Sequence, residues 1–513
     1  MIKYENSHQQ KLDLFKTEFE EKLNPKNKWV TLACLVPWDQ LAEAYYSSMS
    51  SDLGRPGINA RIIIGSMIIK HLKTLTDEDT ILEIQENPYL QYFLGLEAYS
   101  YEPVFAPSLF VEIRRRLGDK FFEVFNQAIV KASQPKAQDN SSKKDGKSSG
   151  DKDSDQTSDK RDSNSADLPN SGSLLMDATV ADQQIAYPTD LNLLNNSREV
   201  CEEIITIMHA KSGSQAKRPR TKSQLARKDY LSVSKQKRAS KKNMRKAIKK
   251  QLQYLSRCIN FIKEYIKGNP ALIDELTNRL KERWLTILKV YDQQKLMYDE
   301  KSHRCEKRIV SLSQPHVRPI VRGKAGKNVE FGSKICMSMN ANGLSFVDKI
   351  SWENCNESSE LIEQVKQFKI RYGYYPEKVH ADQIYGTKAN REFLKENNIR
   401  YIGKPLGRQK TNQTAKERKE KKKEYAIRNR VEGKFGEGKN KYRLGKIRAK
   451  TKETSEAWIK TIFMVMNLAV LLRNFFVEIL KTSLIYTVFL ALLKKTIQPQ
   501  AGYKIFPKLG ATF

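Results

Sequence analysis

The sequence predicts an α/β domain that follows an all-helical domain and contains a long helical hairpin. Three observations support this prediction. Apolar residues recur at helical spacing before residue 131, a polar stretch at 134–172 interrupts the chain, and strand-like segments alternate with a helix between about 308 and 382. The 513 residues correspond to two to four domains of ordinary size.

The first domain, residues 1–131, is predicted to be helical. The apolar residues of its clearest helix are Ile62, Ile63, Met67, Ile68 and Leu72. Thr76, followed by three acids, is a good N-cap for a second helix, which Pro88 ends. A third helix follows Pro107 and carries the arginines 114–116. Two interpretations stay open: a helix-turn-helix that places these arginines in a DNA groove, or a helical domain with a solvated basic face.

Residues 132–172 are predicted to be a disordered linker. From 134 onward the stretch is rich in Ser, Asp, Lys, Asn and Gly and has almost no apolar residues. Such a segment cannot bury enough surface to offset its ordering entropy.

Residues 243–298 are predicted to form two long antiparallel helices. Apolar residues step by four and three, Gly268-Asn269-Pro270 breaks the pattern, and the pattern then resumes. The approach to this hairpin, residues 211–250, holds 16 Lys+Arg and one acid. This segment is either an arm laid along phosphates or the solvated face of a coiled coil, and the hairpin could contact DNA or another subunit.

The α/β region begins with a strand at 174–177 and continues after about residue 308. Residues 334–339 and 344–352 are strand-like and are joined by a hairpin turn at Asn340-Ala341-Asn342-Gly343. Residues 359–372 are predicted to be a helix, and 378–382 a short strand that ends in an acid. Together these segments make a sheet with flanking helices.

The charge of the chain points to a polyanionic partner. With 91 Lys+Arg against 59 Asp+Glu, the formal net charge is +32. Residues 211–250 contribute +15, and residues 401–450, with 18 Lys+Arg and five acids, contribute +13. Two basic surfaces on a nearly neutral protein fit nucleic acid better than a small-molecule enzyme.

The cysteines and the apolar segments indicate a reduced, cytoplasmic protein. The six cysteines are scattered and form no C-x-x-C pair, which argues against a zinc ribbon or a disulfide framework. The N-terminus lacks the pattern of a secretory signal. The apolar stretch from Phe475 to Leu493 is interpreted as a buried helix and not as a membrane span.

Three acids stand out by their settings. Asp177 and Asp382 each end an apolar strand, where an ionised carboxylate is costly unless it meets a cation. Glu432 lies in a segment crowded with Lys and Arg. Two strand-end aspartates and a helical glutamate suffice for two-metal phosphoryl transfer, and their hard oxygen ligands select Mg²⁺ or Mn²⁺. The rival acids are Asp182, Asp190, Asp348 and Glu437.

The spacing around Glu432 predicts one helical stripe. At 100° per residue, Tyr425, Arg428, Glu432 and Lys439 fall within about 60° of one helix face. The stripe offers a carboxylate for a metal, a guanidinium and an ammonium for phosphate, and a phenol that stacks or donates. The alternative is a surface helix with Arg–Glu pairing. Glycines at 433, 436 and 438 weaken that helix unless packing or DNA holds it.

These residues resemble those of a known family. The spacing Tyr425-x2-Arg428-x3-Glu432-x6-Lys439 resembles the signature of the DDE transposases of bacterial insertion sequences, in the large group that includes insertion-sequence family five. Flanking motifs are similar as well: Leu175-Met176-Asp177-Ala178-Thr179, Tyr187-Pro188-Thr189-Asp190, Val329-Glu330-Phe331-Gly332, His380-Ala381-Asp382, and Arg428-Asn429-Arg430-Val431-Glu432-Gly433. Apart from the linker, the likeness runs from about residue 30 to 475.

The resemblance implies a fold and a site. It implies an RNase H-like catalytic domain, residues 173–480, that holds a basic helical insertion at 200–305 and is followed by a tail, residues 481–513. It implies that Asp177, Asp382 and Glu432 bind two Mg²⁺ or Mn²⁺ ions. Arg428 and Lys439 are expected to contact DNA at the terminal inverted repeats. Four further residues are expected at the DNA: Tyr425, Lys434, and the pair Arg322 and Lys324 in a basic turn.

The resemblance also implies an activity and partners. The expected activity is DNA cleavage at terminal inverted repeats, followed by strand transfer into target DNA. Members of the family typically act as multimers that pair both element ends, here in the bacterial cytoplasm at the nucleoid. Two alternatives stay open: a catalytically silent, sequence-specific DNA-binding protein on the same fold, and an RNase H-like nuclease without transposition.

Overall fold

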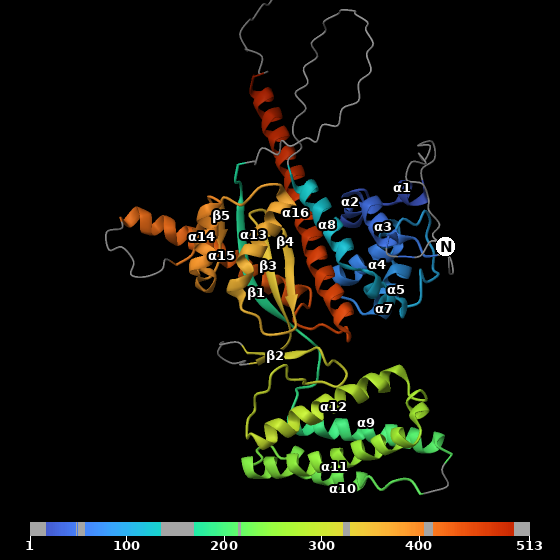
Figure 1. The fold of residues 1–513 in the computed structure, drawn as a ribbon. Coiled ribbons are helices and arrows are strands. Elements are labelled where there is room, and N and C mark those ends of the chain that lie inside the picture. Colours follow the sequence, from blue (N-terminus) through green and yellow to red (C-terminus); the bar gives the residue numbers. More distant parts are fainter. Residues whose placement is uncertain are drawn as a thin grey trace, which may run out of the picture.

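The computed structural model describes residues 17–47, 49, 57–134, 169–213, 217–321, 329–404 and 414–496, with side chains described as far as Glu478. Most of the expected linker, the residues Arg322 and Lys324, and the end of the expected tail lie outside the described residues. Figure 1 shows a larger body, formed by the N-terminal helices and a sheet, and a smaller helical lobe.

The N-terminal domain is helical, as predicted. Its helices in the described part of the chain are α1 (Glu18–Lys22), α2 (Lys28–Leu35), α3 (Trp38–Tyr46), α4 (Ala60–Lys73), α5 (Asp77–Glu86), α6 (Pro88–Phe93), α7 (Leu109–Arg116) and α8 (Asp119–Ser133). Thr76 and Asp79 form a capping box at the start of α5. Pro88 follows the end of α5 and also begins α6, because proline suits the first turn of a helix.

The three arginines of α7 do not share one exposed face. Arg114 is buried, and its two terminal nitrogens donate to the carboxylate of Asp77 at 3.1 and 3.0 Å. Arg115 is exposed, and both it and Arg116 pair with Glu112. Neither sequence interpretation describes Arg114, which links α7 to α5 inside the domain.

The sheet confirms the predicted mixed α/β fold. Its strands are β1 (Ser173–Asp182), β2 (Arg318–Val321), β3 (Val329–Asn340), β4 (Ser345–Ser351), β5 (Lys378–His380) and β6 (Arg400–Ile402). Their order is β2-β3-β1-β5-β6, with β4 on the same side of β3 as β2. β3 is antiparallel to β1, β2 and β4, whereas β5 is parallel to β1 and β6 to β5.

Asp177 lies within a strand and not at its end. β1 continues past it to Asp182, because residues from Ala178 onward keep pairing with β3. The prediction that the strand stops at Asp177 is therefore wrong. The carboxylate sits near the middle of the central strand of the sheet.

Four helices and two short 3₁₀ helices surround the sheet. They are η2 (Glu357–Glu360), α13 (Leu361–Tyr372), η3 (Gln383–Tyr385), α14 (Lys388–Glu396), α15 (Ala415–Lys441) and α16 (Lys452–Thr496). α16 packs on β4 and also on α4, α7 and α8, so it lies between the sheet and the N-terminal domain (Figure 1). By length and composition, residues Lys452–Glu478 could cross a membrane, and 56% of their apolar window is buried inside the protein. The expected buried helix from Phe475 onward is not buried where it begins, because Phe475 and Val477 are exposed.

The smaller lobe contains the predicted hairpin. Its helices are α9 (Asp190–Lys211), α10 (Ser223–Ser234), α11 (Lys241–Gly268), the 3₁₀ helix η1 (Pro270–Ile273) and α12 (Asn278–Asp299). α11 and α12 form the hairpin, with the break at Asn269-Pro270. α9, which the sequence did not predict, packs along α11 and shares its apolar core. The lobe is an insertion in the chain between β1 and β2 (Figure 1).

A partly buried histidine makes the fold sensitive to acid. The ring of His316 packs edge-on against Trp352 at 4.4 Å, and its Nε2 is buried without a hydrogen-bond partner in the described part of the chain. Burial, together with the charges of Arg318 and Lys452, lowers the pKa of His316 from 6.5 to about 4. Protonation of this ring is therefore much easier in the unfolded chain.

We expect the stability to fall as the pH drops from 6.5 toward 4. In that window the unfolded state binds a proton at His316 and the folded state does not. The free energy of unfolding therefore falls by up to roughly 3 kcal/mol. Urea unfolding of the wild type and of His316→Gln at several pH values measures this. The variant should show a shallower pH dependence, and identical slopes would contradict the assignment.

Candidate active site

The register of the sheet brings Asp177 and Asp382 together. β1 and β5 are parallel neighbours, and Leu175 is paired with His380. Each aspartate lies two residues beyond its member of that pair, but β5 ends at His380, so Asp382 follows the strand and does not end it as predicted. The two carboxylates are close enough for the charge of Asp382 to raise the pKa of Asp177. Asp382 also caps η3, where its carboxylate accepts from the Gln383 N–H at 2.7 Å.

α15 carries Glu432 to the same place. This helix packs against both β1 and β5. Arg428 lies one turn before Glu432; its guanidinium is 3.4 Å from the Glu432 carboxylate and 3.5 Å from that of Asp382. One cation therefore stands between two of the three predicted acids.

The position of α15 over the sheet depends on packing that also explains one of its glycines. Val431 and Phe435 are buried against the core. Gly438 allows a close approach, since a Cβ there would lie 3.2 Å from the Leu444 side chain. His380 is buried and bonds to the backbone of Glu424, which ties β5 to α15.

Asp177 is a partly buried carboxylate with other acids nearby. Its pKa is raised first by burial, against the lowering effect of the hydrogen bond from the Ala178 N–H at 2.8 Å. The charges of Glu357 and Asp382 raise it further, while Arg428 opposes them. A cation or a DNA-bound counter-ion at this point would relieve that repulsion.

Two neighbours of the site were missed by the sequence reasoning. Glu357, at the start of η2, adds a fourth carboxylate and is held at 2.8 Å by Lys334. Tyr385 is completely buried, and its hydroxyl has no hydrogen-bond partner in the described part of the chain. Burial raises the pKa of Tyr385, and the charges of Glu357, Asp177 and Asp382 act in the same direction. No motif or spacing distinguishes Glu357 in the sequence.

The carboxylate oxygens of the site suit a hard divalent ion, although they are not gathered into a binding site for one. Among the residues that the structure describes, no three His, Cys, Asp or Glu side chains are close enough together to hold a metal ion. The available donors are carboxylate oxygens, which suit Mg²⁺ and Mn²⁺. The guanidinium of Arg428 takes the place of a counter-ion for Asp382 and Glu432.

The rival acids have other partners. Asp190 pairs with Arg308 at 2.6 Å, and Asp348 is buried against Arg371 at 2.6 Å. Glu437 pairs with Lys434 at 3.0 Å. Asp182 lies at the far end of β1.

The predicted DNA-binding residues divide into two groups. Tyr425 is partly exposed and donates to the Gly403 carbonyl at 3.1 Å, and Lys439 lines a basic hollow of about 390 Å³. Both lie on α15 with Arg428, as predicted. Lys434 is different: it is only 7% exposed and faces Glu437.

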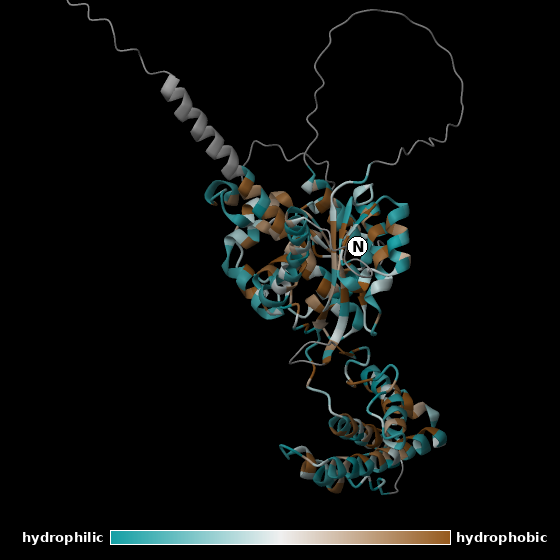
Figure 2. Cartoon of the chain, turned by 90° about the vertical axis from the view of Figure 1, so that its left-hand side faces the viewer, coloured by the Kyte–Doolittle hydropathy of each residue, from teal (hydrophilic) through white to brown (hydrophobic). Residues whose placement is uncertain are grey.

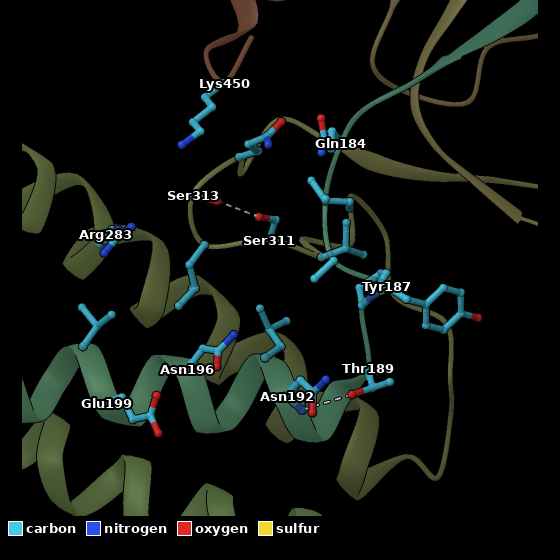
Figure 3. Close-up of a pocket in the computed structure, with 18 of the residues that line it drawn as sticks. Gln184, Tyr187, Thr189, Asn192, Asn196, Glu199, Arg283, Ser311, Ser313 and Lys450 are labelled. Atoms are coloured by element: carbon cyan, nitrogen blue, oxygen red, sulfur yellow. Dashed lines mark hydrogen bonds between the residues drawn. The ribbon is translucent and has the colours of Figure 1, made fainter. Parts of the chain in front are cut away.

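A larger cavity lies away from the carboxylates. It measures about 570 Å³ and sits where the helical lobe joins the body (Figure 3). Arg283 of α12 and Lys450 approach it from different elements, with Glu199 on α9 (Figure 3). None of the three predicted acids lines it, so it is a junction cleft and not the site of the proposed chemistry.

The mixed α/β sheet with its many helices is consistent with a DDE-type transposase domain, and sequence comparison supports that class. Residues 379–469 match the family described as "Transposase DDE domain", and residues 17–116 match "Transposase domain (DUF772)". The first match contains Asp382 and Glu432. Together the two matches support a DDE-type insertion-sequence transposase and do not favour a catalytically silent protein.

One curated relative is similar to part of the chain. It is the "Uncharacterized protein ORF8 in nfe locus" of Rhizobium meliloti, 32% identical over 123 residues. The similarity covers 24% of this chain and 59% of the relative. No solved structure matches the chain.

Proposed function

We propose that this protein is a transposase of the group that includes insertion-sequence family five. It cuts DNA at the terminal inverted repeats of its element and joins the freed ends to target DNA. The observation that carries the proposal is that Arg428 of α15 contacts both Asp382 and Glu432, while the charges of Asp382 and Arg428 act on Asp177. The strand order β4-β3-β1-β5-β6, with β5 and β6 parallel to β1, supports the proposal that the sheet belongs to an RNase H-like fold.

In this proposal Asp177, Asp382 and Glu432 hold two Mg²⁺ or Mn²⁺ ions. When bound, such ions activate the attacking oxygen and stabilise the leaving oxygen of a phosphodiester. Water first breaks the bond to the 3′ oxygen and leaves a 3′-hydroxyl on the element. That hydroxyl then attacks a target phosphate, so no covalent protein intermediate forms.

The basic side chains of α15 position the DNA. In the structure, Arg428 pairs with Asp382 and Glu432. When DNA binds, its guanidinium turns to the scissile phosphate and donates two parallel hydrogen bonds to phosphate oxygens. Tyr425 and Lys439 contact the DNA on either side along the same helix. Arg322 and Lys324 remain proposed DNA contacts that lie outside the described residues. Lys434 is left out of the set because its ammonium is buried against Glu437.

The proposal extends to assembly and location. Since cleavage at two ends must be coordinated, we place the protein as a multimer that pairs both inverted repeats. Its net charge of +32 suits binding to the nucleoid in the bacterial cytoplasm.

End-specific nicking tests the function. The purified protein should nick a duplex that carries the inverted repeats flanking its gene, and only with Mg²⁺ or Mn²⁺ present. A duplex with scrambled ends is the control. Cleavage of both duplexes at equal rates would instead indicate a general nuclease, and binding without any nicking would indicate a silent protein.

A further inference from the structure

The helical lobe carries a cationic surface far more one-sided than the rest of the chain. Residues 211–250 hold 16 Lys+Arg and a single acid, Asp229. In α11 no acid occurs before Glu264. By contrast α12, in the same lobe, mixes Glu282, Asp292 and Asp299 with its lysines, as ordinary solvated helices do.

The cations of α11 lie opposite its buried side. Counted from Lys241 at 100° per residue, Lys242, Lys246 and Lys249 fall at about 80–140°. The buried residues Ala247, Leu255 and Ile262 fall at about 240–320°. All three lysines are exposed. The surface is therefore a continuous outer stripe of α11 and not a scatter of charges.

The one acid of this region does not neutralise the stripe. Asp229 of α10 accepts from Lys250 at 2.9 Å and from Tyr254 at 2.8 Å, so it fastens α10 to α11. Tyr230 donates to Asn192 of α9 at 2.8 Å and fixes the other side of α10.

α10 contributes charged side chains to the surface of the lobe and very little to its hydrophobic core. Its only buried residue is Ala226, whose carbonyl accepts from Gln251 at 2.8 Å. Arg227 and Lys228 on the same helix are exposed. Polar bonds thus hold in place a helix that buries almost nothing and that adds exposed cations to the lobe beside α11.

We infer that the outer face of α10 and α11 binds the phosphate backbone of duplex DNA without reading its sequence. This inference rests on the proposed function and assigns the helical lobe a role in it. In Figure 1 these two helices form the edge of the lobe farthest from the sheet, and Figure 2 shows hydrophilic ribbon along the lobe's exterior. The face therefore binds DNA away from the cleavage site, in the flank of the cut end or in the target.

Duplex DNA fits this face better than a protein partner does. Cores of protein interfaces are depleted in lysine and need aromatic or apolar anchors. On α10 and the first turns of α11, Leu225 is the one large apolar side chain among the described residues that is clearly exposed. Lysine ammonium groups act as point charges for phosphates, and Lys242 to Lys249 span about 10 Å, the length of about three base pairs.

The test compares salt dependence of DNA binding in full-length proteins. All carry Asp382→Asn so that no cleavage intervenes. The probe is a duplex of about 40 base pairs with random sequence, titrated by fluorescence anisotropy over a salt series. The variant is Lys242→Gln/Lys246→Gln/Lys249→Gln. The control is Lys289→Gln/Lys295→Gln/Lys301→Gln, which removes three exposed lysines from the α12 side of the same lobe.

The variant should lower the slope of log K against log salt by about 2.7, since each lost phosphate contact removes about 0.9. At physiological salt the affinity should fall on the order of 100-fold. The control should keep the wild-type slope, and Lys→Arg replacements at 242, 246 and 249 should restore it. An unchanged slope in the Gln variant, or an equal change in the control, overturns the inference.

Two further readouts separate the possible failures. If the variant changes the oligomeric state in sedimentation without changing the salt slope, the face is a subunit contact and the inference is wrong. Nicking of a short end duplex by the control triple variant with Asp382 intact should match that of the wild type. If even the wild type fails to nick, the proposed function fails, while the salt slopes still decide whether this face binds DNA.

Discussion

Replacement of Asp177, Asp382 or Glu432 by its amide should lower metal-dependent nicking by at least about 10³-fold. The amide keeps the size of each side chain but removes the charge that a divalent ion needs. DNA binding should persist, because the basic residues of α15 and the lobe are unchanged. Glu432→Gln should also free Arg428 from one of its two partners. Single-turnover nicking of an inverted-repeat duplex, with binding measured in parallel, gives the comparison.

A matched control comes from the same helix. Glu420 is an exposed acid three turns before Glu432 on α15. Glu420→Gln changes charge by the same amount without touching Asp382 or Arg428, so its nicking rate should stay within about twofold of the wild type. If Glu432→Gln and Glu420→Gln behave alike, Glu432 has no catalytic role.

The largest expected effect on stability lies at the junction of the N-terminal domain with α16. Asp77 is 2.8 Å from Lys70 and accepts two bonds from Arg114. Lys70 and Arg114 are almost completely buried, and both lie 5.2 Å from the Trp458 ring on α16. Burial favours a higher pKa for Asp77, but the bonds and charges of Arg114 and Lys70 lower it overall. One carboxylate thus compensates two buried cations.

Asp77→Asn should therefore cost about 3–5 kcal/mol of unfolding free energy, because it leaves two buried charges without a counter-ion. Urea unfolding at neutral pH measures this cost. Glu112→Gln, which disrupts pairs with the more exposed Arg115 and Arg116, is the control and should cost less than about 1 kcal/mol. A small effect of Asp77→Asn would mean that water or nearby groups replace the lost carboxylate.

Periodicity predicted the parts of the fold whose pattern is local. The α11–α12 hairpin, α4, α5, α15 and the β3–β4 hairpin all follow from spacing and from turn or cap residues. α9 was not predicted, because polar residues such as Asn195, Ser197 and Arg198 occupy buried positions in it and interrupt its apolar stripe. Short strands such as β6 carry too few residues for any pattern.

The sequence named candidate residues for the site but could not give their arrangement. Helical spacing placed Arg428 beside Glu432, and that neighbourhood is observed. The sequence could not show that Arg428 also reaches Asp382, since that contact depends on how α15 lies over β5. Nor could it show that Lys434 turns inward or that Glu357 approaches Asp177, because both are products of tertiary packing.

The positive charge of the chain has two different structural settings. Around α15 it surrounds acids and forms specific pairs, such as Arg428 with Glu432 and Arg400 with Glu424. On α10 and the first turns of α11 it faces outward with one acid, Asp229, that is already engaged. The first setting suits chemistry at one phosphate and the second suits holding a longer stretch of DNA.

The most direct test of the central claim is metal rescue at Asp382. A cysteine thiolate binds Mg²⁺ poorly and accepts the softer Mn²⁺ better. We predict that Asp382→Cys loses nicking of the inverted-repeat duplex in Mg²⁺ by at least about 10³-fold and regains at least about tenfold of it in Mn²⁺. Undiminished nicking by Asp382→Cys in Mg²⁺ would contradict the assignment of this carboxylate as a metal ligand.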